Sequence, residues 1–190
     1  MTDVIVKDNY LPEADFLTIY NKLCNIDQKD PQRLPWFPGN PLKPLQPKVN
    51  ILCQPNENIQ FTHQFIPQRD SNEPFSHIYQ KISMFLPLMD PLVEAMKIKS
   101  CTRIKANLTM RTHEIVRHGF HSDDNDAVSF QDYKVSIFYV NSNDGYTEFE
   151  NGSKVKSVAN RLITFPAFLR HTGTTCTDEP FRVVINFNYF

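Results

Sequence analysis

The feature that most constrains the fold of this chain is a series of short strand-like segments that follows Ser100. Each segment is rich in β-branched and aromatic residues, and turn-forming pairs such as Asn151-Gly152 and Glu179-Pro180 separate several of them. The segments span residues 103–110, 134–141, 146–150, 154–158, 161–165 and 181–190. Short strands at such a spacing predict a β-sandwich or a β-barrel.

The first hundred residues predict a support built from helices and loops. Apolar residues recur at helical spacing over about 12–24, which predicts one helix. A second helix is expected further along, with a buried face made of Phe75, Ile78, Ile82, Phe85 and Leu86. Pro87 or Pro91 is expected to end or kink that second helix.

Length and composition limit the classes of protein to be considered. A chain of 190 residues, 41% of them apolar, is expected to form one domain, 1–190, in which 1–100 support a core formed by 101–190. The 20 basic and 21 acidic residues nearly cancel, which argues against a nucleic-acid partner, because such a partner needs a basic face. The four cysteines form no C-x-x-C pair, so neither a zinc ribbon nor a redox pair is expected.

The sequence also predicts where the protein is found. No apolar segment approaches the roughly 20 residues that cross a bilayer, so no membrane partner is expected. The first ten residues carry Asp3, Lys7 and Asp8 and lack the apolar stretch of a secretory signal. We therefore expect a cytoplasmic protein.

The last segment assigns its side chains to two faces, because successive residues of a strand point in opposite directions. One face is apolar and is expected to be covered by the N-terminal helices; it holds Phe181, Val183, Ile185 and Phe187. The other face holds Arg182, Val184, Asn186 and Asn188. An inner face with arginine and asparagine predicts a site for a polar ligand. An internal carboxylate paired with Arg182, or a solvated sheet edge, is the alternative.

An imidazole and a carboxylate stand two residues apart at His121 and Asp123. On an extended backbone both project from the same face and can bind one metal ion, although a His-x-Asp pair alone also occurs in surface turns. His171, which follows segment 161–165, offers a third ligand. Two histidines and one carboxylate form the facial triad typical of non-haem Fe(II), with positions left for a co-substrate and dioxygen.

A competing cluster occurs in the same region. His113 and His118 could form a zinc site together with His121. That site would leave the carboxylate and the distant histidine of the triad unexplained. We therefore expect His113 and His118 to be dispensable for metal binding.

The order of His-x-Asp, a second histidine and an arginine on successive strands resembles the Fe(II)- and 2-oxoglutarate-dependent oxygenases, in particular their prolyl-4-hydroxylase-like branch. The resemblance covers about 103–190. Segment 136–141, which contains Tyr139, is similar to the family's strand that ends in Tyr-Leu-Asn. Segments 161–165 and 181–186 are similar to the strands that flank the second histidine and carry the co-substrate arginine.

A further segment, 144–149, resembles the family's Gly-Gly-x-Leu-x-Phe run. Asp144 stands at the first glycine of that run, and Thr147 stands at the leucine. The family's usual tyrosine upstream of His-x-Asp has no match in 106–111.

The resemblance implies a mainly β fold, a double-stranded β-helix or jelly roll with N-terminal helices in support. It implies that Fe(II) binds to His121, Asp123 and His171. Arg182 and Tyr139 would bind the distal carboxylate of the co-substrate 2-oxoglutarate, because arginine offers a planar charged fork and tyrosine a neutral donor.

Asn186 lies on the same face of its strand as Arg182. It is a candidate to orient Asp123 or a bound water beside the co-substrate. A cross-strand hydrogen bond is the alternative role for Asn186.

The activity that the resemblance implies is a dioxygenase reaction, in which O2 and 2-oxoglutarate are consumed and the substrate is hydroxylated with release of succinate and CO2. Because Asp123 fills the carboxylate position, hydroxylation is expected rather than halogenation. The resemblance favours a prolyl residue of a peptide or protein as substrate, then a free amino acid or small metabolite, then a nucleobase. Similar short enzymes occur in phages, which would imply the cytoplasm of a host.

Two alternatives from other classes stay open. One is a non-catalytic jelly-roll binding module that holds zinc or no metal. The other is an iron enzyme of the cupin type that uses no keto acid, which would leave Arg182 without a ligand. Iron content, 2-oxoglutarate turnover and thermal stabilisation by 2-oxoglutarate distinguish them.

Overall fold

The fold is given by a computed structural model that describes residues 4–24, 33–39, 60–68, 81–123 and 132–190. The helical elements are α1 (Glu13–Cys24), the 3-10 helix η1 (Leu86–Met89) and α3 (Asp90–Met96). The strands are β1 (Ile5–Lys7), β2 (Phe37–Gly39), β3 (Gln60–Ile66), β4 (Cys101–Met110), β5 (Lys134–Tyr139), β6 (Tyr146–Phe149), β7 (Lys154–Lys156), β8 (Arg161–Pro166), β9 (His171–Gly173) and β10 (Phe181–Tyr189).

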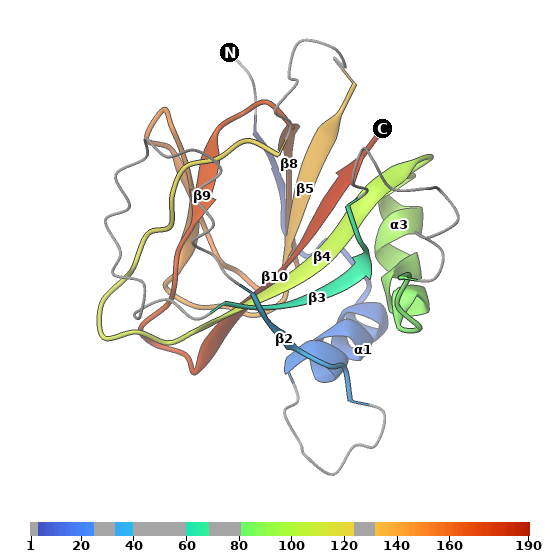
Figure 1. Cartoon of the computed structure of the whole chain (residues 1–190), viewed down its shortest axis with the longest axis horizontal. Helices are drawn as coiled ribbons and strands as arrows, with labels where there is room; N and C mark the ends of the chain where they lie inside the picture. Colours follow the sequence, from blue (N-terminus) through green and yellow to red (C-terminus); the bar gives the residue numbers. More distant parts are fainter. Residues whose placement is uncertain (1–3, 25–32, 40–59, 69–80, 124–131) are drawn as a thin grey trace.

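The strands form two antiparallel sheets. The larger sheet has seven strands in the order β1-β8-β5-β10-β4-β3-β2, and the smaller has three in the order β7-β6-β9. Figure 1 shows the strand β9 on one side of the large sheet and the helices α1 and α3 on the other. The expected mainly β, jelly-roll type of core is confirmed.

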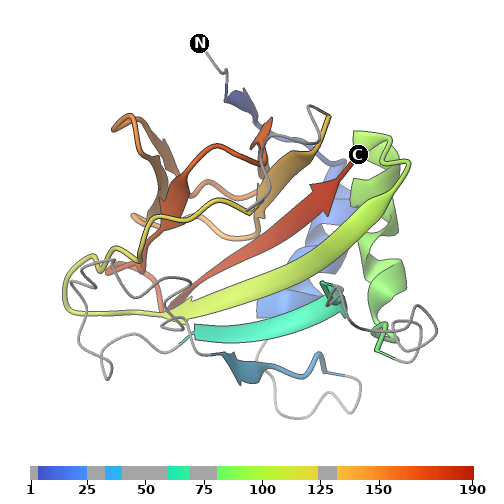
Figure 2. The ribbon, with the colours of Figure 1, turned by 45° about the horizontal axis from the view of Figure 1, so that its top comes forward.

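The outer face of the large sheet is apolar. The helices lie against this face, as Figure 2 shows for the long strands β4 and β10. Val183, Ile185 and Phe187 of β10 pair with Leu108, Ala106 and Ile104 of β4, and all six belong to one buried cluster. The helices add Ile19, Leu23, Met89 and Leu92 to that cluster. The alternation predicted for the last strand is therefore confirmed.

The helix predicted over 12–24 is present as α1. It carries acidic residues in its first turn and Lys22 in its last turn, which suits the helix dipole. None of the described helices is long and apolar enough to cross a membrane.

The prediction of a second helix is wrong over the part that the structure describes. Residues 81–85 form turns and bends, and the helical structure begins only at Leu86. Phe75 and Ile78 of its predicted face lie outside the described residues. Pro87 and Pro91 stand in the first turns of η1 and α3, so they begin helices and do not end one. Proline is tolerated there because the first amides of a helix have no partner within it.

Candidate metal and co-substrate site

Two histidines far apart in the sequence are brought together by a main-chain pairing. Segment 116–121 runs antiparallel beside β9 as an irregular further edge of the small sheet. His121 N donates to His171 O at 3.0 Å, and His171 N donates to His121 O at 2.9 Å. Residues paired in this way project their side chains on the same face. The two imidazole centroids are accordingly 4.6 Å apart.

Each imidazole is oriented by the carbonyl group two residues before it. Nδ1 of His171 lies 3.0 Å from the oxygen of Leu169, and Nδ1 of His121 lies 3.3 Å from the oxygen of Gly119. Because a carbonyl oxygen can only accept, each Nδ1 carries the proton and each Nε2 keeps a lone pair for a metal. Burial, with a further effect of His121, lowers the pKa of His171 to about 4, so this ring is neutral at pH 7.

Asp123 brings a carboxylate to the same point. Its side chain is 7% exposed, and Oδ1 lies 3.9 Å from Nε2 of His121 and 3.7 Å from Nη1 of Arg103. Burial by itself would raise the pKa of this carboxyl, but the electrostatic effects of His121, His171 and Arg103, together with a side-chain hydrogen bond from Asn188, outweigh it, and the pKa of Asp123 is lowered. Oδ2 is buried and has no hydrogen-bond partner among the described residues. A bound cation would satisfy that oxygen.

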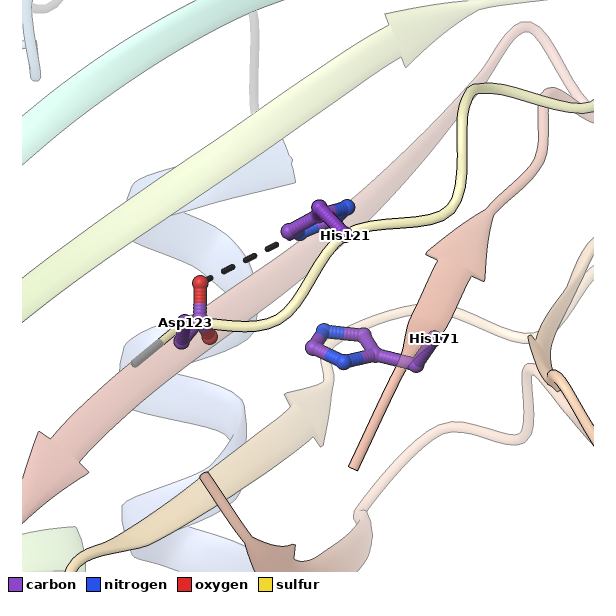
Figure 3. Close-up of side chains that lie close together, drawn as sticks. All are labelled: His121, Asp123 and His171. Carbon is purple, nitrogen blue, oxygen red and sulfur yellow. Dashed lines mark ion pairs between the residues drawn. The ribbon is translucent and has the colours of Figure 1, made fainter. Parts of the chain in front are cut away.

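The three side chains fit a metal ion of the non-haem iron type. One ligand atom from each of His121, Asp123 and His171 lies within 4.8 Å of the others, and Figure 3 shows the three converging. Within the described residues no other group of three ligands is present. His113 and His118 are described and are not part of it, so the competing zinc cluster is not assembled.

Arg182 is a buried cation on the inner face of β10. It is 4% exposed, its Nε donates to Oγ of Ser157 at 2.7 Å, and its Nη2 lies 3.5 Å from Oγ1 of Thr147. None of the described residues pairs a carboxylate with it, so neither a solvated edge nor a described acidic partner explains this side chain. Burial lowers the pKa of the guanidinium, an effect that a bound anion would offset.

Tyr139 lies beside Arg182, with the guanidinium 5.7 Å from the centroid of its ring. The tyrosine is fully buried, and its hydroxyl donates to Oγ1 of Thr147 at 2.7 Å. Burial raises the pKa of Tyr139, so its hydroxyl stays protonated and neutral. Arg182 and Tyr139 thus place a charged and a neutral donor side by side.

The position of Arg182 is fixed by contacts on both sides. Asn141 brackets it along β10, since its Nδ2 donates to the oxygen of Phe181 at 2.8 Å and its Oδ1 accepts from the amide of Val183 at 2.9 Å. A Cβ on Gly145 would lie 2.7 Å from Cδ of Arg182 and 2.6 Å from the oxygen of Thr175. Only glycine therefore allows this close approach.

The departures from the family's glycine-rich run have structural explanations. Asp144 accepts hydrogen bonds from the amide and the hydroxyl of Thr177, and it therefore fixes the turn before β10. Thr147, at the leucine position, supplies the hydroxyl shared by Tyr139 and Arg182.

Some residues around the site were not found from the sequence. Asn188, not Asn186, contributes to the lowered pKa of Asp123, and Oδ1 of Asn186 is buried without a hydrogen-bond partner among the described residues. The role expected for Asn186 stays a prediction. Nε2 of His118 is also buried without a partner in that part of the chain, and burial, with further effects of Arg182 and His121, lowers the pKa of His118 to about 4.

No protein-family model and no curated protein sequence matches this chain. Solved structures match over nearly its whole length. A prolyl hydroxylase from Trichoplax adhaerens, in complex with a peptide of hypoxia inducible factor, is 13% identical, with all of this chain and 84% of that chain covered at a TM-score of 0.61. A prolyl-4-hydroxylase of Pseudomonas putida is 12% identical, with 100% of this chain and 93% of that chain covered at a TM-score of 0.54.

A third match is HygX of Streptomyces hygroscopicus, whose structure holds nickel and 2-oxoglutarate. It is 12% identical, with 99% of this chain and 82% of that chain covered and a TM-score of 0.52. This chain therefore has the fold of the 2-oxoglutarate- and Fe(II)-dependent oxygenases, and the resemblance expected from the sequence is confirmed at the level of the fold.

Proposed function

We propose that this protein is an Fe(II)- and 2-oxoglutarate-dependent dioxygenase that hydroxylates an amino-acid residue, with a prolyl residue of a peptide as the first candidate. The proposal rests on one observation, which is that a metal triad and a buried arginine occur together in this chain. A convergent His121–Asp123–His171 triad and a buried Arg182 without a described acidic partner occur on the fold shared with such oxygenases. Neither feature serves an ordinary core, because buried charges cost stability unless they are compensated.

His121, Asp123 and His171 would hold the iron through Nε2, a carboxylate oxygen and Nε2. The carbonyls of Gly119 and Leu169 fix both imidazoles in the tautomer that binds metal. Iron, when bound, supplies the activation of O2 that couples oxidation of the keto acid to oxidation of the substrate.

Arg182 would bind the distal carboxylate of 2-oxoglutarate by charge-assisted hydrogen bonds, and Tyr139 would add a neutral one by turning its hydroxyl proton from Thr147 to the carboxylate. Ser157 orients the guanidinium through Nε, so its outer nitrogens, of which Nη2 makes only a long contact of 3.5 Å to Thr147, would face the carboxylate. The inner face next to Tyr139 is apolar, with Val135, Ile137, Ile163 and Phe165 all buried. This half of the face excludes water from the reacting groups.

The overall reaction balances in atoms and electrons. One oxygen atom of O2 enters a substrate C–H bond as hydroxyl, and the other enters succinate as 2-oxoglutarate loses CO2. The keto acid and the substrate each supply two of the four electrons that reduce O2. No external reductant is needed for a complete turnover.

Turnover of 2-oxoglutarate tests the proposal. Protein loaded with Fe(II) should convert 2-oxoglutarate to succinate in air, and a substrate in a cell lysate should gain about 16 Da, the mass of one oxygen atom. Protein with bound iron that forms no succinate above the level of Arg182→Met would overturn the proposal. A non-catalytic binding module would then account for the site.

A further inference from the structure

One half of the inner face of the large sheet is polar, in contrast to the apolar half on β5 and β8. The register places Lys105 directly opposite Asn186, and Arg103 directly opposite Asn188. Asn107 and Thr109 continue the same face along β4. We call this set the polar stripe; it consists of Arg103, Lys105, Asn107, Thr109, Asn186 and Asn188.

The polar stripe contains buried atoms without hydrogen-bond partners among the described residues. They are Oδ1 of Asn107, Oγ1 of Thr109, Oδ1 of Asn186 and Oδ1 of Asn188. Asn107, Thr109 and Asn188 are 6%, 2% and 2% exposed. A buried polar atom left without a partner destabilises the folded protein, so a row of four such atoms on one face indicates a polar ligand.

Lys105 lies in the middle of this row and is in ion-pair contact with no carboxylate in the described part of the chain. Burial, with a further effect of Arg103, lowers the pKa of its ammonium group to about 8, despite the opposing effect of Asp123. The nearby cation Arg103 already faces Asp123, at 3.7 Å. None of the seven strands of the large sheet contains an aspartate or a glutamate.

Thr109 lies directly opposite Arg182, and Asn188 acts on Asp123, so these two residues border the sites already described. The proposed co-substrate does not account for the rest of the polar stripe, at Lys105, Asn107 and Asn186. Its distal carboxylate is assigned to Arg182 and Tyr139, and its keto-acid end to the metal. With iron and 2-oxoglutarate bound, and counting only the described residues, the positive charges of the metal, Arg103, Lys105 and Arg182 would still outnumber the negative charges of Asp123 and the keto acid. A neutral substrate would leave that excess uncompensated, whereas an anionic one would reduce it.

We propose that the substrate to be oxidised carries a carboxylate that binds to Lys105, with the side chains of Asn107, Thr109 and Asn186 bonded to polar groups next to it. The inference rests on the proposed function and narrows its substrate class. A free amino acid, or a peptide that has an acidic group close to the oxidised carbon, has this chemistry. An internal residue flanked only by neutral groups does not.

Binding of acetate, the smallest probe with this group, tests the proposal without knowledge of the substrate. The protein is loaded with Zn(II) and saturated with 2-oxoglutarate, so that Arg182 is occupied, and acetate or its neutral isostere acetamide is titrated while amide chemical shifts are recorded by NMR. Acetate should bind saturably at millimolar concentration and shift residues of β4 and β10, and acetamide should bind at least about 10-fold more weakly. In Lys105→Met the affinity for acetate should fall by about 10-fold or more, as expected for loss of a charge-assisted contact, and Lys105→Arg should restore most of it.

Lys156→Met provides the matched control, because Lys156 is exposed on β7 in the small sheet. It should bind acetate like the wild type. Absence of saturable acetate binding, equal binding of acetamide, or unchanged binding in Lys105→Met would overturn the inference, and water would then be the partner of the polar stripe.

A second arm identifies the source of the carboxylate. Amino acids, their N-acetyl derivatives and the corresponding N-acetyl amides are compared as stimulators of succinate formation by the Fe(II) protein. Stimulation by the free amino acids alone assigns a free amino acid, and equal stimulation by the N-acetyl acids assigns a peptide acid group. Stimulation by the amides as strong as that by the acids overturns the inference.

The proposed function is judged separately. Binding of metal and 2-oxoglutarate to Lys105→Met should equal that of the wild type. Failure of the wild type to bind the metal or 2-oxoglutarate would overturn the proposed function instead.

Discussion

His121 and His171 exchange both of their main-chain hydrogen bonds, at 3.0 and 2.9 Å, although fifty residues of sequence separate them. This pairing fixes the separation of the two imidazoles by backbone geometry, before any metal binds. The same two residues also orient their rings on carbonyls of their own segments. A metal site built in this way is preorganised, so loss of one ligand should weaken the metal without unfolding the sheet.

Replacement of Asp123 by alanine should reduce the affinity for Fe(II) by at least about 100-fold, because the only carboxylate of the described triad is removed. Metal content after dialysis, measured by mass spectrometry, checks this. Asp132→Ala is the control, since Asp132 is exposed and outside the triad. Equal iron in Asp123→Ala and the wild type would rule out the ligand assignment.

Replacement of Arg182 by methionine should weaken 2-oxoglutarate binding by about 100-fold or more, which corresponds to roughly 3–5 kcal/mol for a buried carboxylate that loses its charged partner. Much of the apolar stem is kept, and the metal should bind as before. Calorimetry on the Ni(II)-loaded protein measures both affinities. An unchanged affinity for 2-oxoglutarate would remove the co-substrate from this site.

Replacement of Tyr139 by phenylalanine should have a smaller effect in the same direction. One neutral hydrogen bond is lost, at a cost of about 1–2 kcal/mol, so the affinity for 2-oxoglutarate should fall about 10-fold. The same calorimetric titration applies, with Tyr146→Phe in the small sheet as the control. An effect as large as that of Arg182→Met would indicate a rearranged core and not a lost contact.

Alanine at Gly145 should displace Arg182. Its Cβ would lie 2.6 Å from a main-chain oxygen and 2.7 Å from Cδ of Arg182, so the neighbours must shift. We expect lower thermal stability and a several-fold weaker affinity for 2-oxoglutarate, with metal affinity retained. Gly119→Ala is the matched control, because a Cβ there meets nothing within 4 Å. If Gly145→Ala bound 2-oxoglutarate like the control, this glycine would not position the arginine.

The free energy of unfolding of the metal-free protein should decrease as the pH is lowered, and His118 should account for part of the decrease. The pKa of His118 is lowered from 6.5 to about 4, chiefly by burial, so between these values the unfolded chain binds a proton that the folded protein does not. His118 therefore contributes a loss of up to about 3 kcal/mol of unfolding free energy as the pH falls from 6.5 to 4, and none above 6.5.

Urea unfolding at a series of pH values checks this dependence. His118→Gln should lose less stability across that window than the wild type, while the exposed His113→Gln retains the wild-type profile. The residual slope belongs in part to His171, whose pKa is also lowered to about 4. Identical profiles for all three proteins would contradict the burial of His118. Iron should bind to both variants, because neither histidine belongs to the triad.

Local patterns sufficed to predict the parts of the fold that a single strand or helix determines. Alternation along 181–190 identified which side chains of β10 face the helices and which face inward, because that property belongs to one strand. The His-x-Asp pair and His171 have a recognisable spacing and order, and the structure brings them together. Helix α1 has terminal charges and apolar spacing that agree with one another.

Contacts between elements could not be predicted in the same way. Ser157, which accepts from Arg182, and Lys105, which lies opposite Asn186, have ordinary local contexts and acquire their positions only from sheet packing and register. The spacing of Ile82, Phe85 and Leu86 fitted a helix, but Phe85 and Leu86 pack on the core from a turn and a 3-10 helix. Short apolar patterns are ambiguous because a turn can present the same side chains to a core.

The most direct test of the central claim is an anaerobic calorimetric titration of 2-oxoglutarate into the Fe(II)-loaded protein. We predict one binding site per chain, with binding weakened by about 100-fold or more when the iron is removed by a chelator or when Arg182 is replaced by methionine, because the metal and the arginine would hold opposite ends of the same molecule. Equal affinity of 2-oxoglutarate for the iron-loaded protein, the metal-free protein and Arg182→Met would contradict the account.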